Sequence, residues 1–225
     1  MQPDLVAAAV AEVRREIAAH ASRPGVLLCA VTKGFGIDAI RIARDAGCDA
    51  IGENYAQEMA TKIAALGAET HPEVHFIGRI QRNKIKVAAP WVAVWQTVDR
   101  VDVLVDIARR ATGPVRVMVQ VNAAQEAGKG GCRPEEVSDL LAAAAVHGAT
   151  VDGVMTMGPT SQDPELTRRA FRTARRLADD LGLTHCSMGM SGDLRIALEE
   201  GSTLVRLGTR LFGERPVPPL STGIL

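Results

Sequence analysis

A lysine follows the first strongly apolar run of the chain. The run Val26–Thr32 has the length of a β-strand, and Lys33 comes directly after it, followed by a Gly-Phe-Gly segment. An amine at the mouth of an apolar strand is partly desolvated, which disfavours the ammonium form and lowers the pKa. The neutral amine is the form that attacks an aldehyde. An ordinary lysine that extends to solvent is the alternative, and this segment taken alone favours that alternative.

Two segments near the other end of the chain carry the residues of an anion site. Ser191 follows the apolar run Thr184–Met190 and is predicted to be the N-cap of the next helix, with its hydroxyl and free N–H groups pointing outward. Gly208 follows the last apolar run and lets a ligand approach the backbone, where the N–H of Thr209 can join the same cradle. Phosphate sites built from the last two strand-to-helix loops recur in α/β barrels. A plain cap and a structural glycine would explain each residue separately, but not their joint placement.

Arg206 interrupts the apolar run Leu204–Leu207, which is predicted to be a buried strand. A guanidinium keeps its charge, so its burial requires an acceptor or an anion. One interpretation is a buried ion pair with a carboxylate of the barrel. The functional interpretation is a hydrogen bond to the pyridine nitrogen of pyridoxal 5′-phosphate (PLP), a cofactor that has an aldehyde for the lysine and a phosphate for the cradle.

Polar residues also follow other apolar runs, where they would line the same end of a sheet or barrel. Among them Asn54 and Lys129 are candidate cofactor-binding residues, and each could instead be a cap or turn residue. The roles of Glu53, Gln81 and Asn83 stay open at this point.

These residues need a scaffold of strands that end on one side. Eight apolar runs of strand length alternate with segments of helical period, namely Val26–Thr32, Ala50–Gly52, Val74–Gly78, Val92–Val98, Val115–Asn122, Val151–Met157, Thr184–Met190 and Leu204–Leu207. Several are continuously apolar, as expected of parallel strands that are buried on both faces. Strand–helix alternation predicts a parallel sheet with right-handed crossovers. Eight units favour a closed (β/α)₈ TIM barrel over an open, doubly wound sheet, which remains the alternative because periodicity does not report closure.

The remaining segments complete a single domain that spans residues 1–225. An alanine-rich amphipathic helix is predicted from Asp4 to His20, before the first strand. Asp163 and Pro164 are placed to cap and open the helix after the sixth strand. The tail over 216–225, with its three prolines, is expected to be irregular.

Composition and residue spacing argue against several classes of protein. Lys and Arg together equal Asp and Glu at 26 each, so no overall field attracts nucleic acid or an anionic membrane. We find no signal peptide and no apolar run of membrane-spanning length. His71 and His75 are kept off a common helix by Pro72, so no metal site is predicted. The four cysteines form no C-x-x-C pair and are expected to be buried free thiols in a cytoplasmic protein.

The chain resembles the YggS/PROSC-like family of PLP homeostasis proteins (the proline synthase co-transcribed family), which is related to the N-terminal barrel of alanine racemase. The segments that carry the resemblance lie in order over nearly the whole chain. They are AVTK (30–33), IGENYAQE (51–58), HFIGRIQRNK (75–84), EAGKGG (126–131), SMGMS (187–191) and VRLGT (205–209).

The resemblance implies a role for several of these residues. Lys33 would form the Schiff base with PLP, Ser191, Gly208 and Thr209 would contact its phosphate, and Arg206 would face the ring nitrogen. The chain ends soon after the last predicted strand, so the racemase's C-terminal β-domain and its tyrosine base are expected to be missing. The expected function is intracellular PLP carriage and homeostasis by a monomer, with PLP-dependent apo-enzymes as partners, and without established catalysis. A PLP-dependent amino-acid racemase of narrow scope is the alternative.

Overall fold

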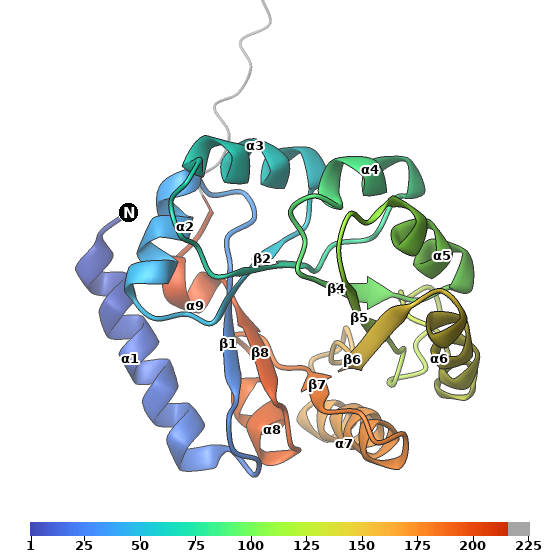
Figure 1. The fold of residues 1–225 in the computed structure, drawn as a ribbon. Coiled ribbons are helices and arrows are strands. Elements are labelled where there is room, and N and C mark those ends of the chain that lie inside the picture. Colours follow the sequence, from blue (N-terminus) through green and yellow to red (C-terminus); the bar gives the residue numbers. More distant parts are fainter. Residues whose placement is uncertain (216–225) are drawn as a thin grey trace, which may run out of the picture.

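Eight parallel strands close into a barrel with helices around it (Figure 1). The strands are β1 (Leu27–Val31), β2 (Ala50–Glu53), β3 (Glu73–Phe76), β4 (Val94–Val98), β5 (Val115–Gln120), β6 (Ala149–Met155), β7 (His185–Ser187) and β8 (Leu204–Leu207). Because β1 pairs with both β2 and β8, the sheet has no free edge. This closure confirms the predicted TIM barrel and excludes the open, doubly wound sheet. The computed structural model describes residues 1–215, and the tail predicted for 216–225 lies outside the described residues.

Helices connect the strands and cover the outside of the barrel. They are α2 (Ile37–Asp45), α3 (Ala56–Leu66), α4 (Ile85–Ala88), α5 (Val101–Arg110), α6 (Val137–Val146), α7 (Pro164–Asp180), α8 (Leu194–Glu199) and, after β8, α9 (Thr209–Phe212). Short 3₁₀ turns, η1 (Arg82–Lys84) and η2 (Pro134–Glu136), precede α4 and α6. The predicted cap of α7 is confirmed, because the Asp163 side chain accepts a hydrogen bond from the Leu166 N–H at 2.9 Å.

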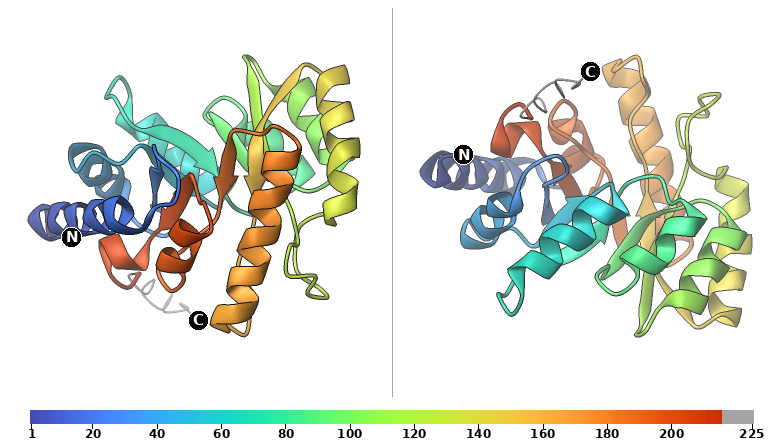
Figure 2. Two further views of the ribbon diagram at one scale, coloured as in Figure 1. Left: turned by 90° about the horizontal axis from the view of Figure 1, so that it is seen from below. Right: turned by 90° about the horizontal axis from the view of Figure 1, so that it is seen from above.

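An additional helix, α1 (Pro3–His20), precedes the first strand, as predicted. Its buried face, formed by Val6, Val10, Val13 and Ile17, packs among α2, α8 and α9. Figure 2 shows α1 (blue) and the segment that ends at α9 (red) on the same side of the molecule. The first and last described elements therefore contact each other directly.

The strands divide the buried residues between two clusters. Side chains alternate between the faces of a strand, so Leu28 and Ala30 pack outward against the helices, whereas Cys29 belongs to a separate, smaller cluster. That cluster also contains Val94, Met118 and other residues contributed by strands on different sides of the barrel, so it lies inside the barrel. Polar side chains share this interior, as described below.

All four cysteines are buried and free. Burial raises the pKa of Cys29, Cys132 and Cys186 to about 12 and that of Cys48 to about 11. The prediction of buried free thiols is confirmed.

Over residues 1–215, no helix has the length and apolarity needed to cross a membrane.

Candidate functional site

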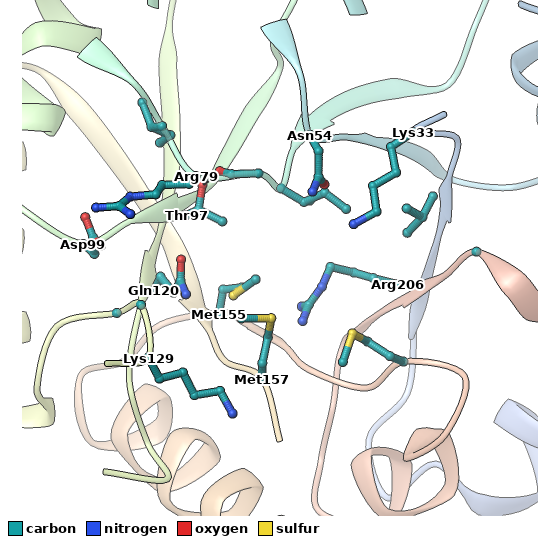
Figure 3. Close-up of a pocket in the computed structure, with 18 of the residues that line it drawn as sticks. Lys33, Asn54, Arg79, Thr97, Asp99, Gln120, Lys129, Met155, Met157 and Arg206 are labelled. Atoms are coloured by element: carbon teal, nitrogen blue, oxygen red, sulfur yellow. Dashed lines mark hydrogen bonds between the residues drawn. The ribbon is translucent and has the colours of Figure 1, made fainter. Parts of the chain in front are cut away.

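A cavity of about 900 Å³ opens at the carboxyl ends of the strands (Figure 3). This is the end of a barrel at which enzymes and binding proteins of this fold place their sites. Every candidate residue from the sequence lines this cavity, namely Lys33, Asn54, Lys129, Ser191, Arg206, Gly208 and Thr209. The structure thus brings together residues that are up to 176 positions apart in the chain (33 to 209).

Lys33 lies half-buried just beyond the end of β1, and its side chain extends into the cavity (Figure 3). Desolvation lowers the pKa of its amine, and the positive charges of Arg215 and Arg206 lower that pKa further, while Glu53 opposes them. The direction agrees with the one expected from the sequence. The environment therefore increases the share of neutral, nucleophilic amine.

The loop that carries Lys33 is held by charged groups on α3. The ammonium of Lys62 is buried and donates to the backbone carbonyls of Thr32 at 3.0 Å and Phe35 at 3.3 Å, on either side of Lys33. Glu58 accepts a hydrogen bond from the Gly34 N–H at 2.7 Å. Sequence reasoning missed this support, and the spacing of Glu58 and Lys62 by four residues on one helix face was the available signal.

Glu53 pairs with Lys62 beneath this loop. The Lys62 nitrogen is 2.5 Å from one Glu53 oxygen, which also accepts from the Thr32 hydroxyl at 2.7 Å. Burial raises the pKa of Glu53, and Lys62 opposes that rise. Glu53, whose role the sequence left open, is thus part of the structure that supports Lys33, whereas Gln81 and Asn83 are exposed and lie outside the cavity lining.

Arg206 is buried at the inner wall of the cavity and is held by neutral acceptors. Its guanidinium donates to the Ser187 hydroxyl at 2.5 Å and to the Thr156 carbonyl at 2.9 Å. Among residues 1–215 no carboxylate forms an ion pair with it, so the buried ion pair considered from the sequence is not what the structure has. Burial lowers the pKa of Arg206, but a guanidinium remains charged in proteins. A positive charge therefore faces the cavity without a bound carboxylate.

The predicted N-cap role of Ser191 is wrong. Helix α8 begins at Leu194 with Asp193 at the N-cap position. Asp193 N–H donates to the Met190 carbonyl at 3.2 Å, and its carboxylate accepts from the Met190 N–H at 2.6 Å. These reciprocal bonds close a tight turn before the helix, so the helix starts later than the sequence suggests. Ser191 lies exposed in this turn and still lines the cavity.

Gly208 lets the end of β8 approach the end of β1. A Cβ atom at Gly208 would lie 3.3 Å from the Val31 Cβ, a tighter contact than side chains usually make. Gly208 is also the N-cap of α9, and its carbonyl accepts from the N–H groups of Leu211 and Phe212. The N–H of Thr209 therefore lies at the open start of the helix, where backbone donors have no intrahelical acceptor.

Asn54 and Lys129 lie on different sides of the cavity (Figure 3). Asn54 is near Lys33, and within residues 1–215 its buried Oδ1 has no hydrogen-bond partner. Lys129 lies across the cavity from Lys33. Its ammonium donates to the Gly158 carbonyl and lies 3.2 Å from a Glu126 oxygen. Asn54 is thus free to meet a polar ligand atom, whereas Lys129 is already engaged by the protein.

Some lining residues were not among the candidates from the sequence. Met155 and Met157 lie between the two sides, and Arg79, Thr97, Asp99 and Gln120 line the side away from Lys33 (Figure 3). Their positions at or just after the ends of β3 to β6 were the signal that could have found them. The charge of Arg215, which acts on Lys33 from beyond β8, had no such signal.

The fold and site define a class of α/β barrels in which a lysine, a buried arginine and a turn rich in backbone donors share one mouth. The model of the family "Alanine racemase, N-terminal domain" matches residues 7–216. Among curated relatives, the pyridoxal phosphate homeostasis protein of Aquifex aeolicus is 38% identical over 198 residues, 84% of this chain and 86% of the relative. The protein of the same name from Pseudomonas aeruginosa is 37% identical over 217 residues, 93% of this chain and 94% of the relative. The chain belongs to the pyridoxal phosphate homeostasis proteins, within the wider family of alanine racemase N-terminal domains.

Solved structures agree with this assignment. PipY of Synechococcus elongatus, solved with PLP bound, has a TM-score of 0.81 and 30% identity, and the match covers 92% of this chain and 100% of PipY. Alanine racemase of Corynebacterium glutamicum has a TM-score of 0.74 at 18% identity, which shows a shared fold only. The match covers 98% of this chain but 64% of the racemase chain. The resemblance inferred from the sequence is confirmed.

Proposed function

We propose that this protein binds PLP, holds it as a Schiff base on Lys33, and acts in PLP homeostasis by carrying and releasing the cofactor. The observation that carries the proposal is that the half-buried Lys33 amine, the buried Arg206 charge and the open start of α9 face one cavity. The comparisons named above support it, since the two curated relatives are called PLP homeostasis proteins and PipY was solved with PLP bound.

The residues present fit this cofactor. When bound, PLP supplies an electrophilic aldehyde carbon within reach of an amine. Lys33 would hold the aldehyde end, and Ser191, Gly208 and Thr209 would hold the phosphate. The buried Oδ1 of Asn54, which has no hydrogen-bond partner within residues 1–215, offers an acceptor to a polar atom of the ligand. The cavity volume of about 900 Å³ is ample for a ligand of this size.

Arg206 favours holding the cofactor over strong carbanion chemistry. It would face the ring nitrogen, and a guanidinium does not readily give up a proton, so the pyridine would remain neutral. PLP enzymes that stabilise a carbanion strongly use an acid at this position. Carriage and release therefore suit this residue better than broad amino-acid chemistry.

A racemase function is not favoured. Racemisation requires acid and base groups on opposite faces of the cofactor. Tyr55 is the only tyrosine of the chain, is 58% exposed and does not line the cavity. The lysine across the cavity, Lys129, is engaged with the Gly158 carbonyl and Glu126. Incubation of PLP-loaded protein with L-alanine in heavy water tests this point, and we expect no rapid loss of the α-proton.

The assignment of Lys33 is tested by borohydride reduction. PLP-loaded protein should be reduced to a stable adduct that peptide mass spectrometry locates at Lys33, and Lys33→Ala should abolish the adduct. Lys129→Ala is the matched control, because it removes another lysine from the same cavity, and it should keep the adduct on Lys33. An adduct at normal stoichiometry in Lys33→Ala protein would contradict the proposal.

The cellular setting follows from the same proposal. We propose that a monomer acts in the cytoplasm as a single domain and passes PLP to apo-enzymes that require it. The balance of 26 basic and 26 acidic residues supports a protein that does not bind nucleic acid. Light scattering would measure the mass in solution, and transfer to an apo-enzyme that gains activity on loading would measure the delivery of PLP.

A further inference from the structure

A chain of hydrogen-bonded side chains crosses the barrel interior from Arg206 to Glu73. The Arg206 guanidinium donates to the Ser187 hydroxyl at 2.5 Å, and that hydroxyl donates to the Gln96 Oε1 at 2.7 Å. The Gln96 Nε2 lies 2.6 Å from His75 Nδ1, and His75 Nε2 lies 3.3 Å from a Glu73 oxygen. Ser187, Gln96 and His75 are each 2% exposed or less. No step of the function proposed above uses these three residues.

The chemistry at the two ends sets the direction of every bond in between. A carboxylate only accepts, so the His75 Nε2 that faces Glu73 carries a proton, and in this Nε2–H tautomer the Nδ1 accepts. The Gln96 NH₂ must therefore face His75, which turns the Gln96 oxygen toward Ser187 and makes the hydroxyl donate to it. Only lone pairs of the Ser187 oxygen remain for Arg206, which itself only donates. The opposite tautomer would set an unprotonated His75 Nε2 against the Glu73 carboxylate, so that two acceptors would face each other.

Glu73, at the far end of this row of hydrogen bonds, is held in place by Arg116. A second Glu73 oxygen accepts from Arg116 at 2.8 Å, and Arg116 also donates to Asp152 at 2.8 Å. The hydrogen bond from His75, followed by the charge of Arg116, holds the pKa of Glu73 at about 2 against burial. The Glu73 carboxylate is therefore an acceptor over the whole working range of pH. His185, which also lies at this end, pairs instead with the Thr203 hydroxyl at 3.3 Å.

We propose that Gln96, backed by His75, is a positioning residue for Arg206. By taking the Ser187 proton, Gln96 presents a pure acceptor to the guanidinium and fixes its orientation toward the cavity. Without Gln96 the Ser187 hydroxyl lacks the acceptor that fixes its rotation, so the lone pair that it presents to the guanidinium is no longer held in place. The part of this inference that concerns cofactor binding rests on the proposed function.

The first test requires no cofactor. Nitrogen-15 NMR of the histidine rings in wild-type apo-protein should show His75 as the neutral tautomer with its proton on Nε2. A proton on Nδ1 would reverse the direction of the hydrogen bonds between His75, Gln96 and Ser187 and would overturn the inference. Because this measurement uses the unmodified protein without PLP, it stands even if the proposed function fails.

The second test uses Gln96→Met, which keeps the approximate side-chain size and removes both the donor and the acceptor. We expect roughly a tenfold loss of PLP affinity, comparable to removing an outer-shell partner of a ligand residue at a metal site. We also expect a shifted absorption band of the bound cofactor. Ser202→Ala is the matched control, since it removes a buried hydroxyl that bonds to the Met188 carbonyl at 2.7 Å and takes no part in the chain. This control should keep the wild-type affinity and spectrum.

The outcomes separate the two proposals. PLP affinity and absorption within twofold of wild type in Gln96→Met would overturn the positioning role, and so would an equal loss of affinity in Ser202→Ala. If wild-type protein forms no borohydride-stable adduct, the proposed function fails, and the tautomer of His75 still decides the inference. Should Gln96→Met not fold, Ser187→Ala measured in the same way takes its place, with the same expected direction.

Discussion

The pKa of the Lys33 amine is lowered by burial and by two charged neighbours that come from distant parts of the chain. Arg206 and Arg215 add positive charge near the amine, and both lower its pKa, as does its own burial. The sequence predicts the effect of burial, because the lysine ends an apolar strand. The contribution of Arg215 depends on a segment beyond β8 that lies against Gly34, where the Arg215 side chain would be 3.2 Å from a Cβ atom.

Uptake of PLP should therefore depend on pH with a lowered midpoint. The uptake rate is expected to rise with pH as Lys33 loses its proton. The pH of half-maximal rate should lie below 10.5, the pKa of an ordinary lysine, and the rate should level off above it. Arg215→Gln removes a positive charge and should raise that midpoint. Stopped-flow absorbance measures both, and Arg210→Gln, in which the lost arginine pairs with Glu16 on α1, is the control. A midpoint at or above 10.5 would contradict this account.

The ion pair of Glu53 and Lys62 leads to a prediction about stability. Lys62→Met leaves the buried Glu53 carboxylate without its counter-charge and frees the loop on both sides of Lys33. Breaking a buried pair from one side costs about 3–5 kcal/mol. Urea unfolding measures this change. Lys86→Met on the exposed face of α4 should stay within about 0.5 kcal/mol of wild type, and an equally small effect for Lys62→Met would count against the role assigned to the pair.

Single residues also show where sequence reasoning stops. The positions of Lys33, Arg206, Gly208 and Thr209 at strand ends follow from the apolar pattern. The Ser191 cap was wrong because Asp193, two residues later, closes a turn on Met190. The partners of Arg206 are Thr156, which directly follows β6, and Ser187 at the end of β7. The sequence pattern does not report which neutral groups meet a buried charge.

At the scale of elements, the strands were predictable because their residues are apolar on both faces. The residues at which the strands end were less predictable. The seventh strand, predicted over Thr184–Met190, spans only His185–Ser187, because Gly189 adopts a φ of +99° and turns the chain. Alternation of strands and helices predicts a parallel sheet, but the pairing of β1 with β8 that closes it is a long-range contact.

The contact between β6 and β7 requires a glycine. A Cβ atom at Gly153 would lie 2.1 Å from the His185 carbonyl oxygen, which is a backbone atom and has no rotamer to change. Gly153→Ala should therefore force the two strands apart and destabilise the protein by about 1–3 kcal/mol, the usual range for overpacking. Thermal unfolding measures the loss. Gly113→Ala meets nothing within 4 Å and is the control; equal stability of the two variants would refute the close approach.

At the scale of the whole molecule, the barrel explains why one mouth collects residues from both ends of the sequence. Every strand points its carboxyl end to the same side, so loops that follow β1, β2, β5, β7 and β8 share the cavity. The low aromatic content of 3% was compatible with this fold, since the barrel packs mainly aliphatic side chains. Helix α1 then joins the two ends of the barrel's helical layer by packing against α2, α8 and α9.

Because all four cysteines are buried and free, their alkylation can report local or global unfolding of the protein. Their pKa values are about 11 to 12 and none is more than 7% exposed, so they should not react with an alkylating reagent at neutral pH while the protein is folded. Cys29 lies within the barrel and Cys48 just before β2, so the order in which they become labelled would map which layer loosens first. We expect mass spectrometry to show all four labelled together, at the rate of global unfolding. Early labelling of Cys48 alone would instead show that the segment before β2 unfolds locally while the barrel remains folded.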